Sequence, residues 1–392
     1  MLITRGHPKS GSICMDDTPK KPIKKNKILL VLLSVVFTLL VLEVICRVWI
    51  NLLAPDEQRQ EYSLYSELKP RERRYIPHHY LNYYPNPEYR ANNTYHNSLG
   101  YRNDEFPVQK PQGVYRIVAI GGSSTYTIEV GDNEKTFTAQ LEKILRDKYG
   151  YKNVQVINAG VGGYNSWESL INLELRALDL DPDLIIVYHG TNDVHTRLVE
   201  PSLYRGDNSG RREQWEEPGV NILEYSALLR IILRKTGITS QAGLRKFVNA
   251  ESAYGPFELE GRDPMELLDK NPPIYFRRNL INMVAVSRAN GADIMLTTWA
   301  HSPHFDGDES TPYYRRGFSE NNQAVREVAY EHDVPLFEFA DVMPQDKKYW
   351  ADGRHVNELG ARKKAELFAG FINESGIIPR SQYKTSSDLQ LD

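Results

Sequence analysis

The chain has 392 residues, 41% of them hydrophobic and 25% charged, and its formal net charge is −3. A chain of this composition can bury a full globular core. The body of the chain lacks a long basic block, which argues against a nucleic-acid partner. Only two cysteines occur, Cys14 and Cys46, and both precede the part that has the pattern of a folded domain. A disulfide framework is therefore excluded there.

The N-terminal part is predicted to carry a membrane anchor. Residues 1–27 are rich in lysine, and residues 28–50 are apolar except for a few positions, among them Glu43 and Arg47, which are spaced to pair on one helix face. About 20 apolar residues can cross a bilayer, and positive charge before the span predicts a cytoplasmic N-terminus. We expect an uncleaved, single-pass signal anchor with the remaining chain outside the cytoplasm. A cleaved signal peptide and a buried core helix are the alternatives.

Residues 51–115 form a polar connector that is rich in tyrosine. Disordered linkers are poor in aromatic residues, so we expect this connector to pack on the domain that follows. That domain is expected over residues 116–376, with an insertion at 195–273 over the edge of its sheet and one helix near 225–234. Residues 377–392 are expected to form a polar tail.

From residue 116 onward, short apolar runs alternate with segments of helical spacing. The expected strands are 116–121, 154–157, 184–188, 294–298 and 334–339, and the expected helices include 136–149, 320–331 and 358–372. This alternation predicts an α/β fold, in which a parallel sheet lies between helices.

Three of the expected strands end in residues that can take part in catalysis. Gly121 and Gly122 precede Ser123 after the first strand, Gly163 follows the second, and Asn192 follows the third. The carboxyl ends of parallel strands share one edge of a sheet, where ligands bind. Each motif alone also fits a turn or a helix cap, but together they predict one site.

Near the C-terminus, Asp352 and His355 precede the closing helix in a loop that should reach the same edge. A serine hydroxyl becomes a nucleophile when a base such as His355 takes its proton, and Asp352 can hold the imidazole in the required tautomer. The backbone N–H groups of Ser123 and Gly163, with the side-chain amide of Asn192, are candidate donors to the oxyanion. Asp352, His355 and Ser123 are therefore the predicted catalytic residues.

These motifs closely resemble those of the SGNH, or GDSL-type, hydrolase family. The family's first block, Gly-Asp-Ser-x-Thr, matches residues 121–125 except that Gly122 replaces the aspartate, and its second-block glycine matches Gly163. The blocks Gly-x-Asn-Asp and Asp-x-x-His are complete at 190–193 and 352–355. The resemblance implies a flavodoxin-like, three-layer α/β/α sandwich and a serine esterase that uses no metal or cofactor.

His301, His304, Asp306 and Asp308 lie close together in the sequence and could supply metal ligands. Their loop contains Pro303 and is not a helix or strand that would hold these side chains on one side, so a substrate-binding role for His301 and His304 is favoured over a metal site. The expected reaction is hydrolysis of an O-acyl ester, with O-acetyl groups on carbohydrate as the leading substrate. The alternatives are an O-acyltransferase that uses the same serine, a lipid or thioester hydrolase, and a non-catalytic binding module. No nucleic-acid partner is expected.

Overall fold

The computed structural model describes residues 25–210, 221–239 and 261–379. The expected basic N-terminus therefore lies almost entirely outside the described residues, as does most of the expected polar tail. A five-stranded parallel sheet forms the centre of the domain, in the order β6-β5-β7-β8-β9. Its strands are β5 (Tyr115–Gly121), β6 (Val154–Gly160), β7 (Leu184–Tyr188), β8 (Asp293–Thr297) and β9 (Leu336–Phe337).

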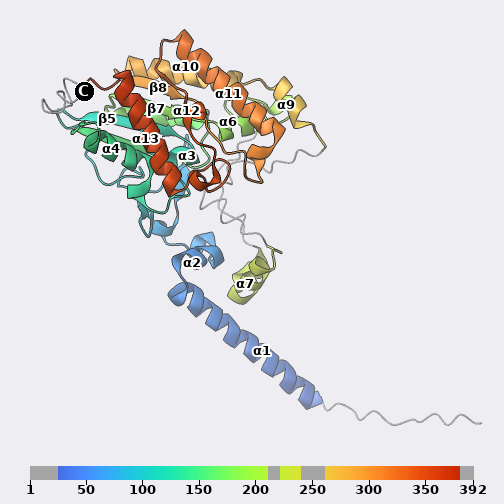
Figure 1. Cartoon of the computed structure of the whole chain (residues 1–392). Helices are drawn as coiled ribbons and strands as arrows, with labels where there is room; N and C mark the ends of the chain where they lie inside the picture. Colours follow the sequence, from blue (N-terminus) through green and yellow to red (C-terminus); the bar gives the residue numbers. More distant parts are fainter. Residues whose placement is uncertain (1–24, 211–220, 240–260, 380–392) are drawn as a thin grey trace, which may run out of the picture.

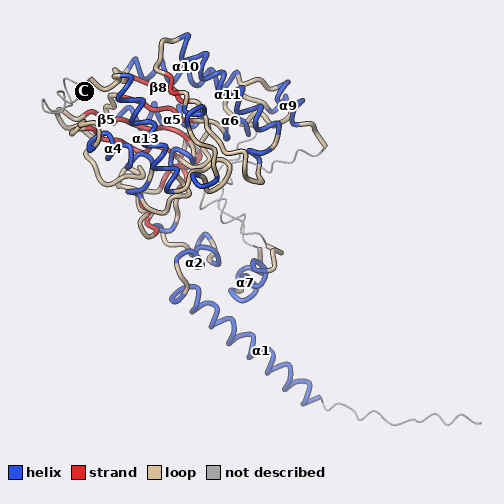
Figure 2. Tube along the Cα trace, viewed as in Figure 1, coloured by secondary structure: helices blue, strands red, loops and turns tan. Residues whose placement is uncertain are grey.

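Helices cover both faces of this sheet, which gives the three layers predicted from the sequence (Figure 2). Successive side chains of a strand point to opposite faces, so Ile117 and Val118 of β5 belong to different cores. On the face of Ile117 lie α4 (Phe137–Asp147) and α13 (Glu358–Ser375). On the face of Val118 lie α5 (Ser166–Asn172), α10 (Ile274–Ala289) and α11 (Pro312–Glu331).

Shorter helices complete the domain. They are α3 (Ser123–Tyr126), α6 (Thr191–His195), α9 (Pro264–Lys270) and α12 (Phe339–Val342). The last expected strand, 334–339, is wrong in length: β9 has two residues, because it pairs only with β8 and α12 begins at Phe339. Helix α11 begins at Pro312, well before residue 320, because the Thr311 side chain caps its N-terminus.

The connector carries two small antiparallel hairpins and packs on the domain. The strands are β1 (Tyr75–His78), β2 (Asn82–Pro85), β3 (Arg90–Ala91) and β4 (Thr94–Tyr95). Tyr75 and Tyr83 are fully buried in one cluster with Val161 and Tyr164, which follow β6. The hairpin β1–β2 therefore lies against the second strand end of the predicted site.

Figure 1 shows α1 (Lys25–Val48) extending away from the sheet, with α2 (Asp56–Tyr62) and α7 (Ala227–Lys235) beside its C-terminal end. The apolar stretch Asn26–Leu53 is long enough to cross a membrane, as is also true of some signal sequences. The described part of the insertion differs from the prediction. Helix α7 packs on α1 and α2 instead of covering the sheet edge, and α9, which was not expected, packs on α11.

Candidate active site

The nucleophile candidate Ser123 begins α3 directly after β5. Glycines on neighbouring strands permit this sharp turn, because a Cβ on Gly121 would lie 2.3 Å from the carbonyl oxygen of Tyr188 and one on Gly160 would lie 2.3 Å from the backbone nitrogen of Tyr126. Side chains at these positions would collide with the backbone. The glycines therefore let the turn at Ser123 sit close to both adjacent strands.

Ser123, His355 and Asp352 form one hydrogen-bonded chain. The Ser123 Oγ lies 2.8 Å from His355 Nε2, and His355 Nδ1 lies 2.7 Å from Asp352 Oδ2. Because an ionised carboxylate can only accept, Nδ1 carries the imidazole proton and Nε2 presents a lone pair to the serine hydroxyl. The structure brings together the three residues that the sequence predicted, although 232 positions separate Ser123 from His355.

Asp352 is held as a carboxylate by its surroundings. Burial raises its pKa, but the His355 ring and the backbone N–H groups of Arg354 and His355 donate hydrogen bonds to it, and the net result is a pKa below the usual value. Both backbone bonds reach Oδ1 at 2.7 Å, which leaves Oδ2 for the imidazole. The carboxylate is thus oriented by the loop that also carries the histidine.

Two further contacts hold the nucleophile turn in place. The Ser124 Oγ donates to the carbonyl oxygen of Arg354 at 3.0 Å, which joins the turn to the histidine loop. Lys364 of α13 donates from Nζ to the carbonyl oxygen of Ser124 at 3.2 Å and lies 3.8 Å from the centre of the Tyr188 ring. Burial lowers the pKa of Lys364 well below its usual value.

The side-chain amide of Asn192 lies beside this turn. Its Nδ2 donates to the carbonyl oxygen of Tyr164 at 2.8 Å, which fixes the amide and leaves its second N–H for another acceptor. A Cβ on Gly122 would lie 2.8 Å from the same Nδ2. The glycine that replaces the family's aspartate therefore gives the amide room beside Ser123.

Gly163 adopts the left-handed conformation, with φ +80°, in the loop after β6. The hydroxyls of two connector tyrosines hold the neighbouring peptide units: Tyr75 Oη accepts from the Gly162 N–H at 3.0 Å, and Tyr83 Oη donates to the Gly162 carbonyl at 2.7 Å. Sequence reasoning missed these two residues as part of the site. Their only sequence signal was the density of tyrosine in the connector.

The connector also supports the far end of the nucleophile helix. The Arg102 guanidinium donates to the carbonyl oxygens of Tyr126 and Thr127 at 3.0 and 2.8 Å. His96 lies between the Tyr126 hydroxyl and the Asn86 carbonyl oxygen, at 2.8 Å from each, and burial lowers its pKa to about 3. His96 is therefore neutral near pH 7.

A small cavity opens beside Ser123, with an accessible volume of about 10 Å³, which is roughly the space that one water molecule requires. Its lining is formed by residues 122–124, 164, 188–192, 299 and 354. Three buried polar atoms in this lining make no hydrogen bond within the described residues: His189 Nε2, Thr191 Oγ1 and Trp299 Nε1. Tyr164 lines the cavity, whereas its neighbour Gly163, a predicted oxyanion donor, does not.

His301 and His304 do not line this cavity. The His301 ring packs 4.9 Å from Phe318, and its pKa is lowered by burial and then by Arg315, while His304 is exposed. The residue of this segment that reaches the cavity is Trp299, which stacks on Tyr188. Its position immediately beyond the fourth strand was the signal that could have identified it.

In the ranges that the structure describes, one group of three side chains could supply metal ligands, namely Glu129, Asp352 and His355. Both ring nitrogens of His355 are already hydrogen-bonded, to Ser123 and to Asp352. This group therefore consists of the His355–Asp352 pair already described and the exposed carboxylate of Glu129.

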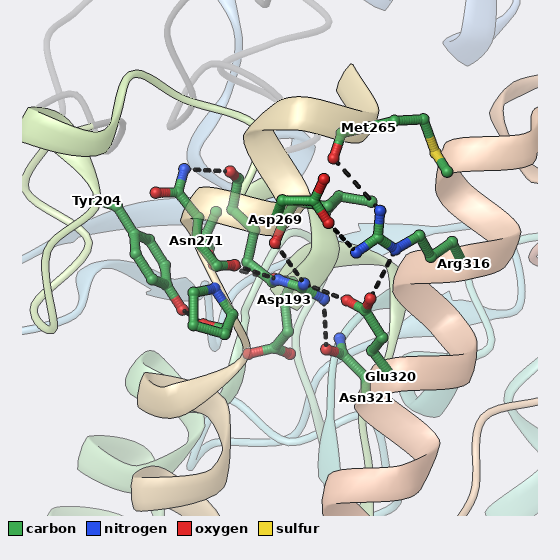
Figure 3. A network of polar contacts seen from close by, with 12 residues as sticks. Asp193, Tyr204, Met265, Asp269, Asn271, Arg316, Glu320 and Asn321 are labelled. Carbon is green, nitrogen blue, oxygen red and sulfur yellow. Dashed lines mark hydrogen bonds and ion pairs between the residues drawn. The ribbon is translucent and has the colours of Figure 1, made fainter. Parts of the chain in front are cut away.

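The third strand end is fixed by a buried polar network, shown in Figure 3. Arg197, which follows α6, donates to the carbonyl oxygen of Asn271 at 2.8 Å and to Glu320 of α11. Asp193 accepts the backbone N–H of Ser166 at 2.9 Å. These contacts tie the segment that carries Asn192 to α9, α11 and α5, so the amide is presented from a rigid support.

Ser123, His355 and Asp352, joined at the edge of a parallel sheet, have the arrangement found in serine hydrolases. Residues 119–363 match the GDSL-like Lipase/Acylhydrolase family, and the chain belongs to this family. The resemblance seen in the sequence motifs is thereby confirmed. No sequence among the curated proteins matches the chain.

Solved structures of similar proteins include a lipase/acylhydrolase from Enterococcus faecalis, with 16% identity and a TM-score of 0.41 over 67% of this chain and 97% of that one. An acetyl xylan esterase from Geobacillus stearothermophilus has 15% identity and a TM-score of 0.41, with the same coverage of 67% and 97%. Both identities are low, so neither similarity bears on the substrate of this enzyme.

Proposed function

We propose that the protein is a membrane-anchored serine esterase that removes short acyl groups, foremost acetyl, from a carbohydrate outside the cytoplasm. The observation that carries the proposal is the hydrogen-bonded chain from Ser123 through His355 to Asp352. In this proposal α1 is the anchor, and the lysine-rich segment before it keeps the N-terminus cytoplasmic.

The reaction follows from the protonation states of this chain. Ser123 Oγ attacks the ester carbonyl carbon while its proton passes to His355 Nε2. Asp352 stabilises the imidazolium, and Asn192 with the backbone N–H groups of Ser123 and Gly163 binds the oxyanion. The imidazolium then protonates the leaving alkoxide. Water attacks the acyl-serine, His355 takes its proton, and the carboxylic acid leaves with Ser123 restored.

The cavity beside Ser123 supports a short acyl group and a polar substrate. Its volume is near that of one water molecule, so a long acyl chain has no preformed space within it. The lining also carries polar residues, among them His189, Thr191 and Asn192, which suit a substrate with hydroxyl groups better than an apolar chain.

The test compares Ser123→Ala with Ser375→Ala in the full chain. Ser375 is an exposed serine at the end of α13 whose hydroxyl bonds only to the Ile372 carbonyl of its own helix, so it is the control. We expect Ser123→Ala to abolish fluorophosphonate labelling and acetyl-ester hydrolysis, and Ser375→Ala to retain both. Turnover by Ser123→Ala would refute the nucleophile, and faster hydrolysis of octanoyl than of acetyl esters would refute the acyl preference.

A further inference from the structure

Helix α7 of the insertion is joined to the end of α1 by polar contacts. The Glu43 carboxylate accepts from the Ser226 hydroxyl at 2.7 Å and from the backbone N–H groups of Ala227 and Leu228 at 2.9 and 3.0 Å. Arg47 donates both to Glu43 and to the Tyr225 carbonyl, each at 2.7 Å. Glu43 thus satisfies the unpaired N–H groups that begin α7, where a negative charge is favourable.

These contacts resolve a difficulty in the apolar stretch Asn26–Leu53. The uncharged run from Ile28 to Leu42 is about 22 Å long as a helix, which is shorter than the roughly 30 Å of a bilayer's hydrocarbon core. Glu43 and Arg47 must therefore lie close to the lipid if α1 spans the membrane. A charge there is costly unless it is paired, and α7 supplies the partners.

Both arginines of α7 face the protein, whereas Lys235 at the end of the helix is exposed. Arg230 is buried and pairs with Glu67 at 3.1 Å, and Arg234 donates to the carbonyl oxygen of Ser63 at 3.2 Å. Ala227 packs against Ile50 and Tyr62. One side of α7 is therefore fully used in contacts with α1, α2 and the connector.

On the other side of this segment, several large apolar residues are exposed, although Ala227 and Ile231 pack inward. Ile222 is 82% exposed, Ile238 is 72% exposed and Ile232 is 46% exposed, and Leu52 at the end of α1 is 77% exposed. Others in this group are Leu53, Leu223, Tyr225 and Leu229. The arginines are turned inward and many apolar side chains are turned outward, while Lys235 and Thr236 are exposed at one end. So many exposed apolar residues suit a helix that lies in a membrane interface, where the basic end can remain in water.

We propose that α7 and residues 222–225 lie in the membrane interface beside the end of α1, with their apolar side chains in lipid. The inference rests on α1 spanning the membrane, as proposed above. Lipid, rather than a protein partner, is the occupant because α7 packs directly on α1, whose apolar side chains are exposed along its length, so a bilayer around α1 also meets α7. The insertion thereby gives the enzyme a second attachment that holds its catalytic domain near the bilayer.

The test places a fluorescent label at single cysteines of the full chain, in a background with Cys14→Ala and Cys46→Ala. The sites are Ile232→Cys on α7, Phe37→Cys within α1 and Tyr330→Cys, a position of α11 that is 91% exposed. Each variant is reconstituted into phosphatidylcholine vesicles that contain lipids with a quencher at a shallow or a deep carbon. Fluorophosphonate labelling of Ser123 shows that each variant is folded.

We expect the label at position 232 to shift to the blue and to lose fluorescence mainly to the shallow quencher. The label at position 37 should respond mainly to the deep quencher, and the label at position 330 to neither. Quenching at 37 with a response at 232 like that at 330 would overturn the inference while the anchor stands. An unquenched label at 37 would overturn the anchor and this inference together, and leave the catalytic assignment untouched.

Discussion

The hydroxyl of Tyr75 offers a sharp test of the idea that the connector supports catalysis. Tyr75→Phe keeps the ring in its cluster with Val161 and Tyr164 and removes one oxygen. That oxygen accepts the N–H of Gly162, and both residues are buried, so the substitution leaves a buried donor without its partner. Such a loss destabilises a folded protein by about 1–3 kcal/mol.

The same loss should reach catalysis, because Gly162 precedes the proposed oxyanion donor Gly163. If about 1.4 kcal/mol of this penalty is added to the activation free energy, kcat drops roughly tenfold. The assay is hydrolysis of p-nitrophenyl acetate, with the urea midpoint of each variant measured in parallel. We expect lower kcat and a lower midpoint, with KM little changed.

Tyr80→Phe is the matched control, because Tyr80 lies in the turn between β1 and β2 and is 67% exposed. Tyr80→Phe removes a tyrosine hydroxyl from the same hairpin but leaves the hydrogen bonds of Gly162 in place. The reasoning would be refuted if Tyr75→Phe and Tyr80→Phe had equal kcat and equal midpoints.

Three further substitutions test other parts of the site. Asn192→Ala should lower kcat about 100- to 1,000-fold in steady-state assays, and a loss below tenfold would remove the amide from the oxyanion site. Because the pKa of His96 is lowered in the folded protein, the free energy of unfolding should fall as pH drops below 6.5, by about 2 kcal/mol at pH 5. His96→Gln should flatten this pH dependence in urea titrations, and the same pH dependence in variant and wild type would contradict the prediction. Gly190→Ala should lower the urea midpoint by the equivalent of about 1–3 kcal/mol, because its Cβ would lie 2.1 Å from Trp299 Cγ, and an unchanged midpoint would contradict the packing.

The sheet was predictable from the sequence because strands buried on both faces are continuous apolar runs. Residues 184–188 form β7 as expected, and the glycine pair before Ser123 indicated the turn at the end of β5. The joining of Ser123 to His355 was also predictable, since parallel strand ends share an edge and the Asp-x-x-His block precedes the last helix.

Other parts of the site depend on contacts that no local pattern encodes. The position of Trp299 just beyond β8 marks it as a candidate, but its stacking on Tyr188 is a tertiary contact, and so is the packing of His301, two residues later, on Phe318. Likewise, a helix near 225–234 was predicted, but not its position, which is set by contacts with distant segments, among them those of Glu43 and Glu67.

The hydrogen bonds of Tyr75 and Tyr83 to Gly162 bear on how much of the chain the enzyme needs for activity. The family match starts at residue 119, and the central sheet starts at Tyr115. A fragment cut at either point would keep Ser123, His355 and Asp352 but would lose the hydroxyls that hold the second-block loop, and also Arg102 and His96. We therefore expect the smallest active unit to be larger than the family core, and a soluble version should be truncated upstream of Tyr75.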